Sequence, residues 1–155
     1  MSRYIRPRVP GATVFFTVAL ADRGAHTLVE RIGELRAAVR LTRAERPFRI
    51  DAWVVLPDHM HAVWTLPPGD HDFSTRWSVI KARFTQSVPV EARRPSHIRR
   101  RERGLWQRRF WEHHIRDEEA FAACLQYCWT NPVKHGLVEH PEDWPFSSWH
   151  RDARP

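Results

Sequence analysis

Cysteine is scarce in this chain, and long apolar runs are absent. Of the 155 residues only Cys124 and Cys128 are cysteines, and they are four positions apart. Two cysteines one helical turn apart exclude a disulfide framework, and the C-x2-C spacing of many zinc sites is missing. We therefore expect two small buried residues at these positions, with a zinc site as the less favoured alternative.

No segment carries the roughly 18 consecutive apolar residues that a membrane-spanning helix needs. Pro7 and Pro10 interrupt the basic N-terminal stretch, and the short apolar run Val14–Leu20 has no small-residue cleavage site behind it. We therefore expect a cytoplasmic protein. The length and the hydrophobic content of 42% predict one folded domain over residues 1–155, with a short C-terminal tail from about residue 141.

Acidic residues are fewer than basic ones. The chain has 25 Lys and Arg against 18 Asp and Glu, which gives a formal charge of +7 and a pI near 10.6. This balance favours an anionic partner, nucleic acid first. The basic residues gather in and just after a connector at about 90–105, and between the first and the last of them Glu102 is the only acidic residue: Arg93, Arg94, Arg99, Arg100, Arg101, Arg103, Arg108 and Arg109. Such a segment can follow a phosphate backbone, and a solvated disordered loop is the alternative.

Hydrophobic periodicity predicts the order of the elements in the first half of the chain. Val14–Leu20 alternates as a strand, and Thr27 with Glu30 forms a capping-box pattern that opens a helix to about Arg46. Phe48–Leu56 and His59–Leu66 then predict an antiparallel hairpin, because Pro57 and Asp58 supply turn residues between them.

The second half predicts a helix, a strand and a third helix. Ser74 or Thr75 can cap the second helix, Phe110–Ile115 is an aromatic strand, and Asp117 opens the third helix, which Asn131–Pro132 and Gly136 close. The complete order is typical of an α+β fold with an antiparallel sheet and two helices on one face, in the ferredoxin-like or RRM-like arrangement. The third helix carries Tyr127.

His59 and His61 are the first candidates for chemistry. Residues two apart on a strand point to the same face, about 6.6 Å apart along the chain, so the two imidazoles can share one metal ion. Met60, Ala62 and Trp64 form an apolar row on the opposite face, which predicts that the histidines lie on the open side of the sheet. A buried hydrogen-bonded histidine pair is the alternative.

Tyr127 and Asn131 are one turn apart on the third helix, beside its apolar stripe. Such residues can reach the sheet that the helix covers and can therefore approach the histidine pair. The simpler alternatives are a tyrosine that only packs and an asparagine that ends the helix.

The motifs of this chain, taken together, resemble those of the REP-associated tyrosine transposases, single-domain relatives of the HUH single-strand transposases of insertion sequences. The resemblance covers nearly the whole chain. It rests on these segments: Pro10–Thr17, Pro47–His61, Trp64–Gly69, Phe73–Trp77, Leu105–Asp117, Tyr127, Asn131–Gly136 and Asp143–Ser148. Trp129 departs from the pattern, since relatives often carry His or Tyr there.

The resemblance implies a role for each matching residue. His59 and His61 match the HUH pair, Tyr127 matches the nucleophile, and Asn131 matches the third metal ligand. The implied fold is an RRM-like sheet, the implied cofactor is a divalent metal, Mg²⁺ or Mn²⁺, and the implied partner is single-stranded DNA folded as a palindromic hairpin. The implied reaction is cleavage and rejoining of that DNA. We expect a 5′-phosphotyrosine intermediate, which retains the energy of the broken ester for rejoining.

Basic side chains outside the histidine pair are the candidates for phosphate contact. We predict DNA binding by these residues: Arg76, Lys81, Arg99, Arg100, Arg101, Arg103, Arg108 and Arg109. Exposed aromatics such as Trp106 or Trp111 can stack on unpaired bases. Three alternatives stay open: a hairpin-binding protein that does not cut, a metal-dependent nuclease that uses water, and an RNA-binding protein.

Overall fold

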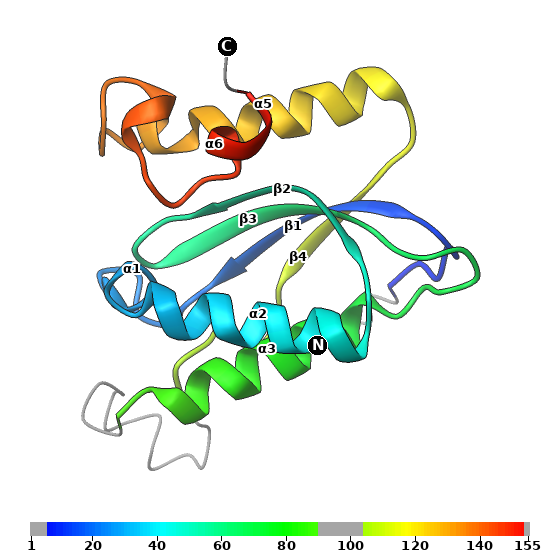
Figure 1. The fold of residues 1–155 in the computed structure, drawn as a ribbon, viewed down its shortest axis with the longest axis horizontal. Coiled ribbons are helices and arrows are strands. Elements are labelled where there is room, and N and C mark those ends of the chain that lie inside the picture. The colour runs from blue at the N-terminus through cyan, green and yellow to red at the C-terminus, as the bar shows by residue number, and fades with distance from the viewer. Residues whose placement is uncertain (1–5, 90–103, 154–155) are drawn as a thin grey trace.

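The structure is a computed structural model that describes residues 6–89 and 104–153 (Figure 1). Its elements follow the order predicted from the sequence. They are β1 (Thr13–Ala19), α1 (Thr27–Glu30), α2 (Ile32–Glu45), β2 (Arg49–Val55), β3 (His59–Thr65), α3 (Phe73–Ser87), β4 (Trp111–Ile115), α5 (Glu118–Lys134), the 3-10 turn η2 (Pro141–Asp143) and α6 (Trp149–Asp152). No helix within the described ranges combines the length and apolarity needed to span a bilayer.

The four strands form one antiparallel sheet in the order β2-β3-β1-β4. The strands β3 and β1 are therefore the two central strands, and β2 and β4 are the two edges. This is the ferredoxin-like order, and the α+β fold class predicted from the sequence is confirmed. The β2–β3 hairpin turns at Pro57 and Asp58, as expected, and brings His59 to the start of β3.

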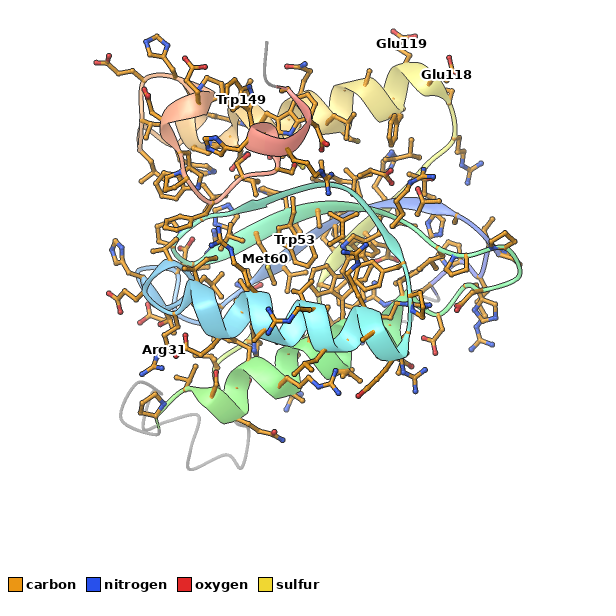
Figure 2. All side chains as sticks on the ribbon, in the orientation of Figure 1. Arg31, Trp53, Met60, Glu118, Glu119 and Trp149 are labelled. Atoms are coloured by element: carbon orange, nitrogen blue, oxygen red, sulfur yellow. The ribbon has the colours of Figure 1, made fainter. Side chains whose placement is uncertain are left out.

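One face of the sheet packs against α2 and α3 (Figure 1). Alternate residues of β1 and β3, Phe16 and Trp64 among them, are fully buried there. Trp64 stacks on Trp77 of α3 with ring centroids 4.2 Å apart and planes 14° from parallel. Trp53 and Met60 point toward the same layer (Figure 2). The largest apolar side chains of the sheet therefore form a single core on this side.

The opposite face lies under α5, which crosses the sheet on the other side from α2 and α3 (Figure 1). Ala52, Val54 and Val63 of the sheet pack there against Cys128. The prediction that the histidines lie on an open side of the sheet is therefore wrong, because a helix covers that side. Cys124 and Cys128 are free thiols; Cys128 is buried, as the apolar interpretation predicted, whereas Cys124 is half-buried.

The starts of two helices differ from their predicted caps. The side chain of Thr27 does not cap α1, which begins after His26 without a side-chain cap, and a break at Arg31 separates α1 from α2. The cap of α3 is Asp72 and not Ser74 or Thr75 as predicted, because Asp72 accepts a hydrogen bond from the backbone N–H of Thr75 at 2.9 Å. A short carboxylate before the first turn satisfies the same free N–H groups as a hydroxyl would.

The segment after α5 returns to the sheet and follows the edge of β2. Val55 donates its backbone N–H to Phe146 at 2.9 Å, and Ser148 donates to the carbonyl of Trp53 at 2.8 Å. Trp129 reaches this segment from α5, donating its indole N–H to Ser148 Oγ at 3.2 Å. The side chain that departs from the family pattern is therefore directed at the tail of the chain.

Candidate active site

His59 and His61 lie side by side on β3, beneath α5. Their ring centroids are 5.1 Å apart, and the two residues are 6% and 5% exposed. The two-residue period of the strand places both rings on the α5 face, as the spacing predicted. Phe15 of β1 stacks on His61 with centroids 5.5 Å apart and planes 14° from parallel, so an apolar wall limits the movement of that ring.

Each imidazole makes a hydrogen bond through its Nδ1 atom. Asp58 Oδ1 lies 2.7 Å from His59 Nδ1, and Thr17 Oγ1 lies 2.8 Å from His61 Nδ1. When both Nδ1 atoms donate, the Nε2 atoms keep their lone pairs and can bind a cation. Asp58, which only accepts, selects this tautomer for His59, and the Thr17 hydroxyl is able to accept from His61 in the same way. Thr17 reaches His61 because the two residues are direct partners in the β1–β3 register.

Arg23 completes the surroundings of His59. Its Nε donates to Asp58 Oδ2 at 3.2 Å, and its Nη2 lies 3.3 Å from His59 Nδ1. One Nδ1 atom cannot donate to a carboxylate and accept from a guanidinium together. We assign the Nδ1 proton to the shorter contact, with Asp58, because a carboxylate can only accept. Arg23 then interacts mainly with Asp58 and not with the imidazole.

Burial keeps both imidazoles neutral near pH 7. It lowers the pKa of His61 to about 3, helped by the positive charges of His59, His135, Lys134 and Arg23. Burial also lowers the pKa of His59, against the opposing effect of the hydrogen bond that His59 donates to Asp58. Although burial raises it, the pKa of Asp58 lies below its usual value because of the hydrogen bonds from His59 and Arg23. Neutral imidazole is the form that binds metal ions.

Tyr127 approaches the histidines from α5. The helix opens at Asp117, whose carboxylate accepts the N–H of Ala120 at 2.7 Å, so the predicted cap is present. Three turns later the ring of Tyr127 meets that of His61 edge to face, with centroids 5.1 Å apart, and that of Phe15 at 5.6 Å. Tyr127 is 38% exposed, so its phenol lies beside the imidazoles and remains open to solvent. The tyrosine and the histidine pair meet within one chain.

Asn131 lies one turn beyond Tyr127 and is fully buried. Both polar atoms of its amide are buried and have no hydrogen-bond partner among the described residues. A buried amide left without partners costs free energy of about 1–3 kcal/mol. Tyr127 contacts His61 and His135 contacts His59, so Asn131 lies between two positions of α5 that touch the pair. An amide oxygen that needs a partner at this place fits the predicted third ligand.

Sequence reasoning assigned no chemistry to Lys134 or His135 at the end of α5. Lys134 Nζ lies 5.1 Å from the ring centroid of Tyr127, and the ring of His135 lies 5.2 Å from that of His59. The helix ends at Gly136, whose positive φ of 73° lets the N–H of Leu137 reach the carbonyl of Pro132 at 2.9 Å. This ending holds Lys134 and His135 beside the site. The sequence alone does not show that Lys134 and His135 lie beside the site, because this depends on how α5 is placed over β3.

No trio of His, Cys, Asp or Glu suited to hold a metal ion occurs in the described part of the chain. The predicted set is of another kind, since it joins two imidazoles to an amide oxygen. Such nitrogen and oxygen donors suit a divalent cation that keeps open positions for a substrate. The free Nε2 atoms and the partnerless Asn131 amide therefore fit such a cation.

The prediction of a phosphate contact for Arg76 is corrected. Arg76 is 3% exposed, and its guanidinium donates to Asp70 and to the carbonyls of Arg46, Pro47 and Asp72. The hydrogen bond from Arg76 holds the pKa of Asp70 at about 2. Its donors are thus used inside the protein, and this arginine ties α3 to the loop that precedes it and to the connection between α2 and β2.

The other predicted DNA-binding residues lie elsewhere. Lys81 on α3 is half-buried, donates to the carbonyl of Gln107 at 3.2 Å, and has its pKa lowered to about 8 by burial and by the charge of Arg6. Since α3 lies below the sheet, Arg76 and Lys81 are on the opposite side from the histidines. Arg108 and Arg109 are exposed just before β4. The remaining four, Arg99, Arg100, Arg101 and Arg103, lie outside the described residues.

Comparisons with known proteins agree with this fold. No family model matches the chain. The chain is 45% identical over 153 residues to the REP-associated tyrosine transposase of Escherichia coli K12, covering 99% of this chain and 86% of that protein. A relative from Haemophilus influenzae is 44% identical over 156 residues, covering 99% of this chain and 89% of the relative.

Solved structures give the same result. The structure of the REP-associated tyrosine transposase bound to a REP hairpin superimposes with a TM-score of 0.87 at 45% identity, over 99% of this chain and 86% of that one. A Deinococcus radiodurans structure at 19% identity, with a TM-score of 0.51, shares the fold, over 81% of this chain and 95% of that one. Identities of 44–45% over nearly the whole chain show its class, the tyrosine transposases. Within that class, the chain belongs to the REP-associated tyrosine transposase family.

Proposed function

We propose that this protein cleaves and rejoins single-stranded DNA at palindromic hairpins through a covalent bond to Tyr127. The observation that carries the proposal is the contact between the rings of Tyr127 and His61, 5.1 Å apart, within one chain. A phenol held against two neutral imidazoles and a partnerless amide unites a nucleophile with a set of cation donors. The hairpin partner is supported by the related protein that was solved bound to a REP hairpin.

His59, His61 and Asn131 would hold a divalent cation, Mg²⁺ or Mn²⁺. When bound, such a cation supplies Lewis-acid stabilisation of charge on phosphate oxygens. Asp58 and Thr17 fix the imidazoles through Nδ1, so the rings need no reorientation when the DNA binds. The desolvated position of both rings keeps them unprotonated for this task.

Tyr127 carries the covalent step. Its Oη forms a bond to the scissile phosphorus while the bond from phosphorus to the 3′ oxygen breaks, which leaves a 5′-phosphotyrosine and a free 3′-hydroxyl. The phenol proton passes to solvent, and the departing 3′ oxygen takes up a proton. The charge of Lys134, 5.1 Å from the ring centroid, favours the phenolate that forms on the way. One ester replaces another, so a 3′-hydroxyl can reverse the step and rejoin the strand.

The test is a covalent-adduct assay. Full-length protein is incubated with Mn²⁺ and a labelled oligonucleotide that folds as a palindromic hairpin with unpaired extensions, and the products are separated on a denaturing gel. We expect an adduct from the natural protein, none with EDTA, and none from Tyr127→Phe, which should still bind the hairpin. Tyr4→Phe is the matched control, because Tyr4 is the other tyrosine of the chain, and it should form the adduct normally.

Each alternative predicts a different result. An adduct of normal yield from Tyr127→Phe would overturn the role of Tyr127. Cleavage that persists in Tyr127→Phe without any adduct would point to a nuclease that uses water. Binding of the hairpin without cleavage by the natural protein, under all cation conditions, would identify a protein that holds the hairpin and does not cut it.

A further inference from the structure

Trp111 is the most exposed large apolar side chain among the described residues. It is 71% exposed, whereas the other seven tryptophans are buried or half-buried. Within residues 6–89 and 104–153 its ring makes no aromatic or cation contact. A single exposed apolar residue is common on protein surfaces, so its position in the sheet must decide whether it has a role.

The strand register places Trp111 in line with the candidate active site. Trp111 on β4 is the direct partner of Thr17 on β1, and Thr17 is the direct partner of His61 on β3. Directly paired residues project to the same face with Cβ atoms about 5 Å apart, so the Cβ atoms of Trp111 and His61 are about 10 Å apart. Thr17, between them, makes the hydrogen bond to His61. Trp111 therefore lies on the same face as the histidine pair.

The surroundings of Trp111 leave its ring accessible. The buried contacts of α5 are with Ala52 and Val54 of β2 and with Val63 of β3, away from the start of β4. On the opposite face of β4, Glu112 forms an ion pair with Arg6, and the ring of His114 lies 5.8 Å from that of Phe73. The side chains of β4 that face α3 are thus engaged within the protein, and Trp111 on the other face is not.

The charge near Trp111 suits a nucleic-acid strand. Arg109 and Arg116 flank β4, both are exposed, and neither makes an ion pair with a described residue. A flat exposed aromatic ring between two exposed arginines offers stacking for a base and charge for its phosphates. An apolar protein partner would gain nothing from these charges.

We propose that Trp111 is a stacking platform for one unpaired base, one or two nucleotides from the phosphate that Tyr127 attacks. The inference rests on the proposed function, since it places the strand across the face shared by His61, Thr17 and Trp111. Successive nucleotides of one strand lie about 3.4 Å apart along a stacked duplex and farther apart when the strand is extended, so about 10 Å corresponds to very few nucleotides. The platform holds the strand in register while the hairpin stem binds elsewhere.

The test measures binding in EDTA, so that cleavage does not enter. Full-length protein, Trp111→Ala and Trp111→Phe are titrated with the same hairpin oligonucleotide, and with versions that carry an abasic site at each unpaired position in turn. We expect Trp111→Ala to bind about 5- to 100-fold more weakly and Trp111→Phe to recover most of the loss. One abasic position should weaken the natural protein and leave Trp111→Ala unchanged. Leu41→Ala, at an exposed site on α2, is the control and should bind normally.

Two results would overturn the platform. The first is that Trp111→Ala binds as tightly as the natural protein, or loses affinity equally for every abasic oligonucleotide. The second is that light scattering finds a dimer that Trp111→Ala dissociates, which would assign the side chain to a contact between copies. Failure of the proposed function is seen separately, as hairpin binding in EDTA with no adduct in Mn²⁺.

Discussion

The two faces of the sheet differ in the kind of side chain that they bury. On the α2–α3 face, Phe16, Trp64 and Trp77 are fully buried and stack on one another. On the α5 face, buried polar groups replace the aromatic core, and the amide of Asn131 has no partner among the described residues. One sheet therefore carries a face that stabilises the fold and a face that holds reactive groups.

This difference explains how a small protein can hold groups that cost stability. Burial of large aromatics contributes most of the free energy of folding on the first face. The second face then tolerates two desolvated imidazoles and a free amide, because the stability that these groups cost is small beside the stability that the aromatic burial contributes. We expect substitutions on the α2–α3 face to affect mainly stability, and substitutions on the α5 face to affect mainly function.

The largest effect should come from the α2–α3 face. Trp77→Ala removes a fully buried indole, so we expect the free energy of unfolding to fall by about 3–5 kcal/mol. Urea denaturation followed by far-UV circular dichroism measures the change, with Trp111→Ala as the exposed control, which should stay within about 0.5 kcal/mol. Equal losses in the two variants would contradict the assignment of the core to this face.

A smaller effect, on cation affinity, should come from the residue behind His59. Asp58→Asn keeps an acceptor near Nδ1 but removes the charge that fixes the ring, so we expect Mn²⁺ to bind about 10- to 100-fold more weakly. Electron paramagnetic resonance of free Mn²⁺ measures the affinity. Asp51→Asn is the control, because Asp51 bonds to Arg49 and Thr65 instead of to a histidine. Unchanged affinity in Asp58→Asn would remove Asp58 from the site.

The smallest effect should be a gain in stability. Asn131→Leu replaces a buried amide without partners by an apolar side chain of similar size, and we expect the protein to be about 1–2 kcal/mol more stable in EDTA. Thermal denaturation measures this, and Mn²⁺ should raise the melting temperature of the natural protein only. Thr130→Leu, exposed on the same helix, is the control. A less stable Asn131→Leu in EDTA would show that the amide has a structural partner.

Much of the fold could be predicted from the sequence, because local patterns carry it. The alternation around Met60, Ala62 and Trp64 set the buried face of β3, and Asp117 marked the start of α5. The error at the histidine face arose because no local pattern states which face a third helix covers. The cap errors have two origins. The helix α1 begins after His26 without any side-chain cap, and in α3 Asp72, which precedes Ser74 and Thr75, accepts the N–H of Thr75.

The candidate site was predictable only in part. His59, His61, Tyr127 and Asn131 were selected from spacing and family resemblance, and the structure brings them together, while their roles stay predictions. Thr17 was not foreseen, because it reaches His61 only through the β1–β3 register. Arg76 was misjudged because composition cannot distinguish an arginine on the surface from one buried among carbonyls.

The tail that follows the edge of β2 makes the two borders of the sheet unequal. The hydrogen bonds from Val55 to Phe146 and from Ser148 to Trp53 occupy backbone groups on that border. Among the described strands, β4 forms the other border, and exposed strand edges can accept a further strand. Any extended chain that added a strand to the sheet would therefore pair with β4, next to Trp111. There it would compete with a nucleic-acid strand for the surface around Trp111.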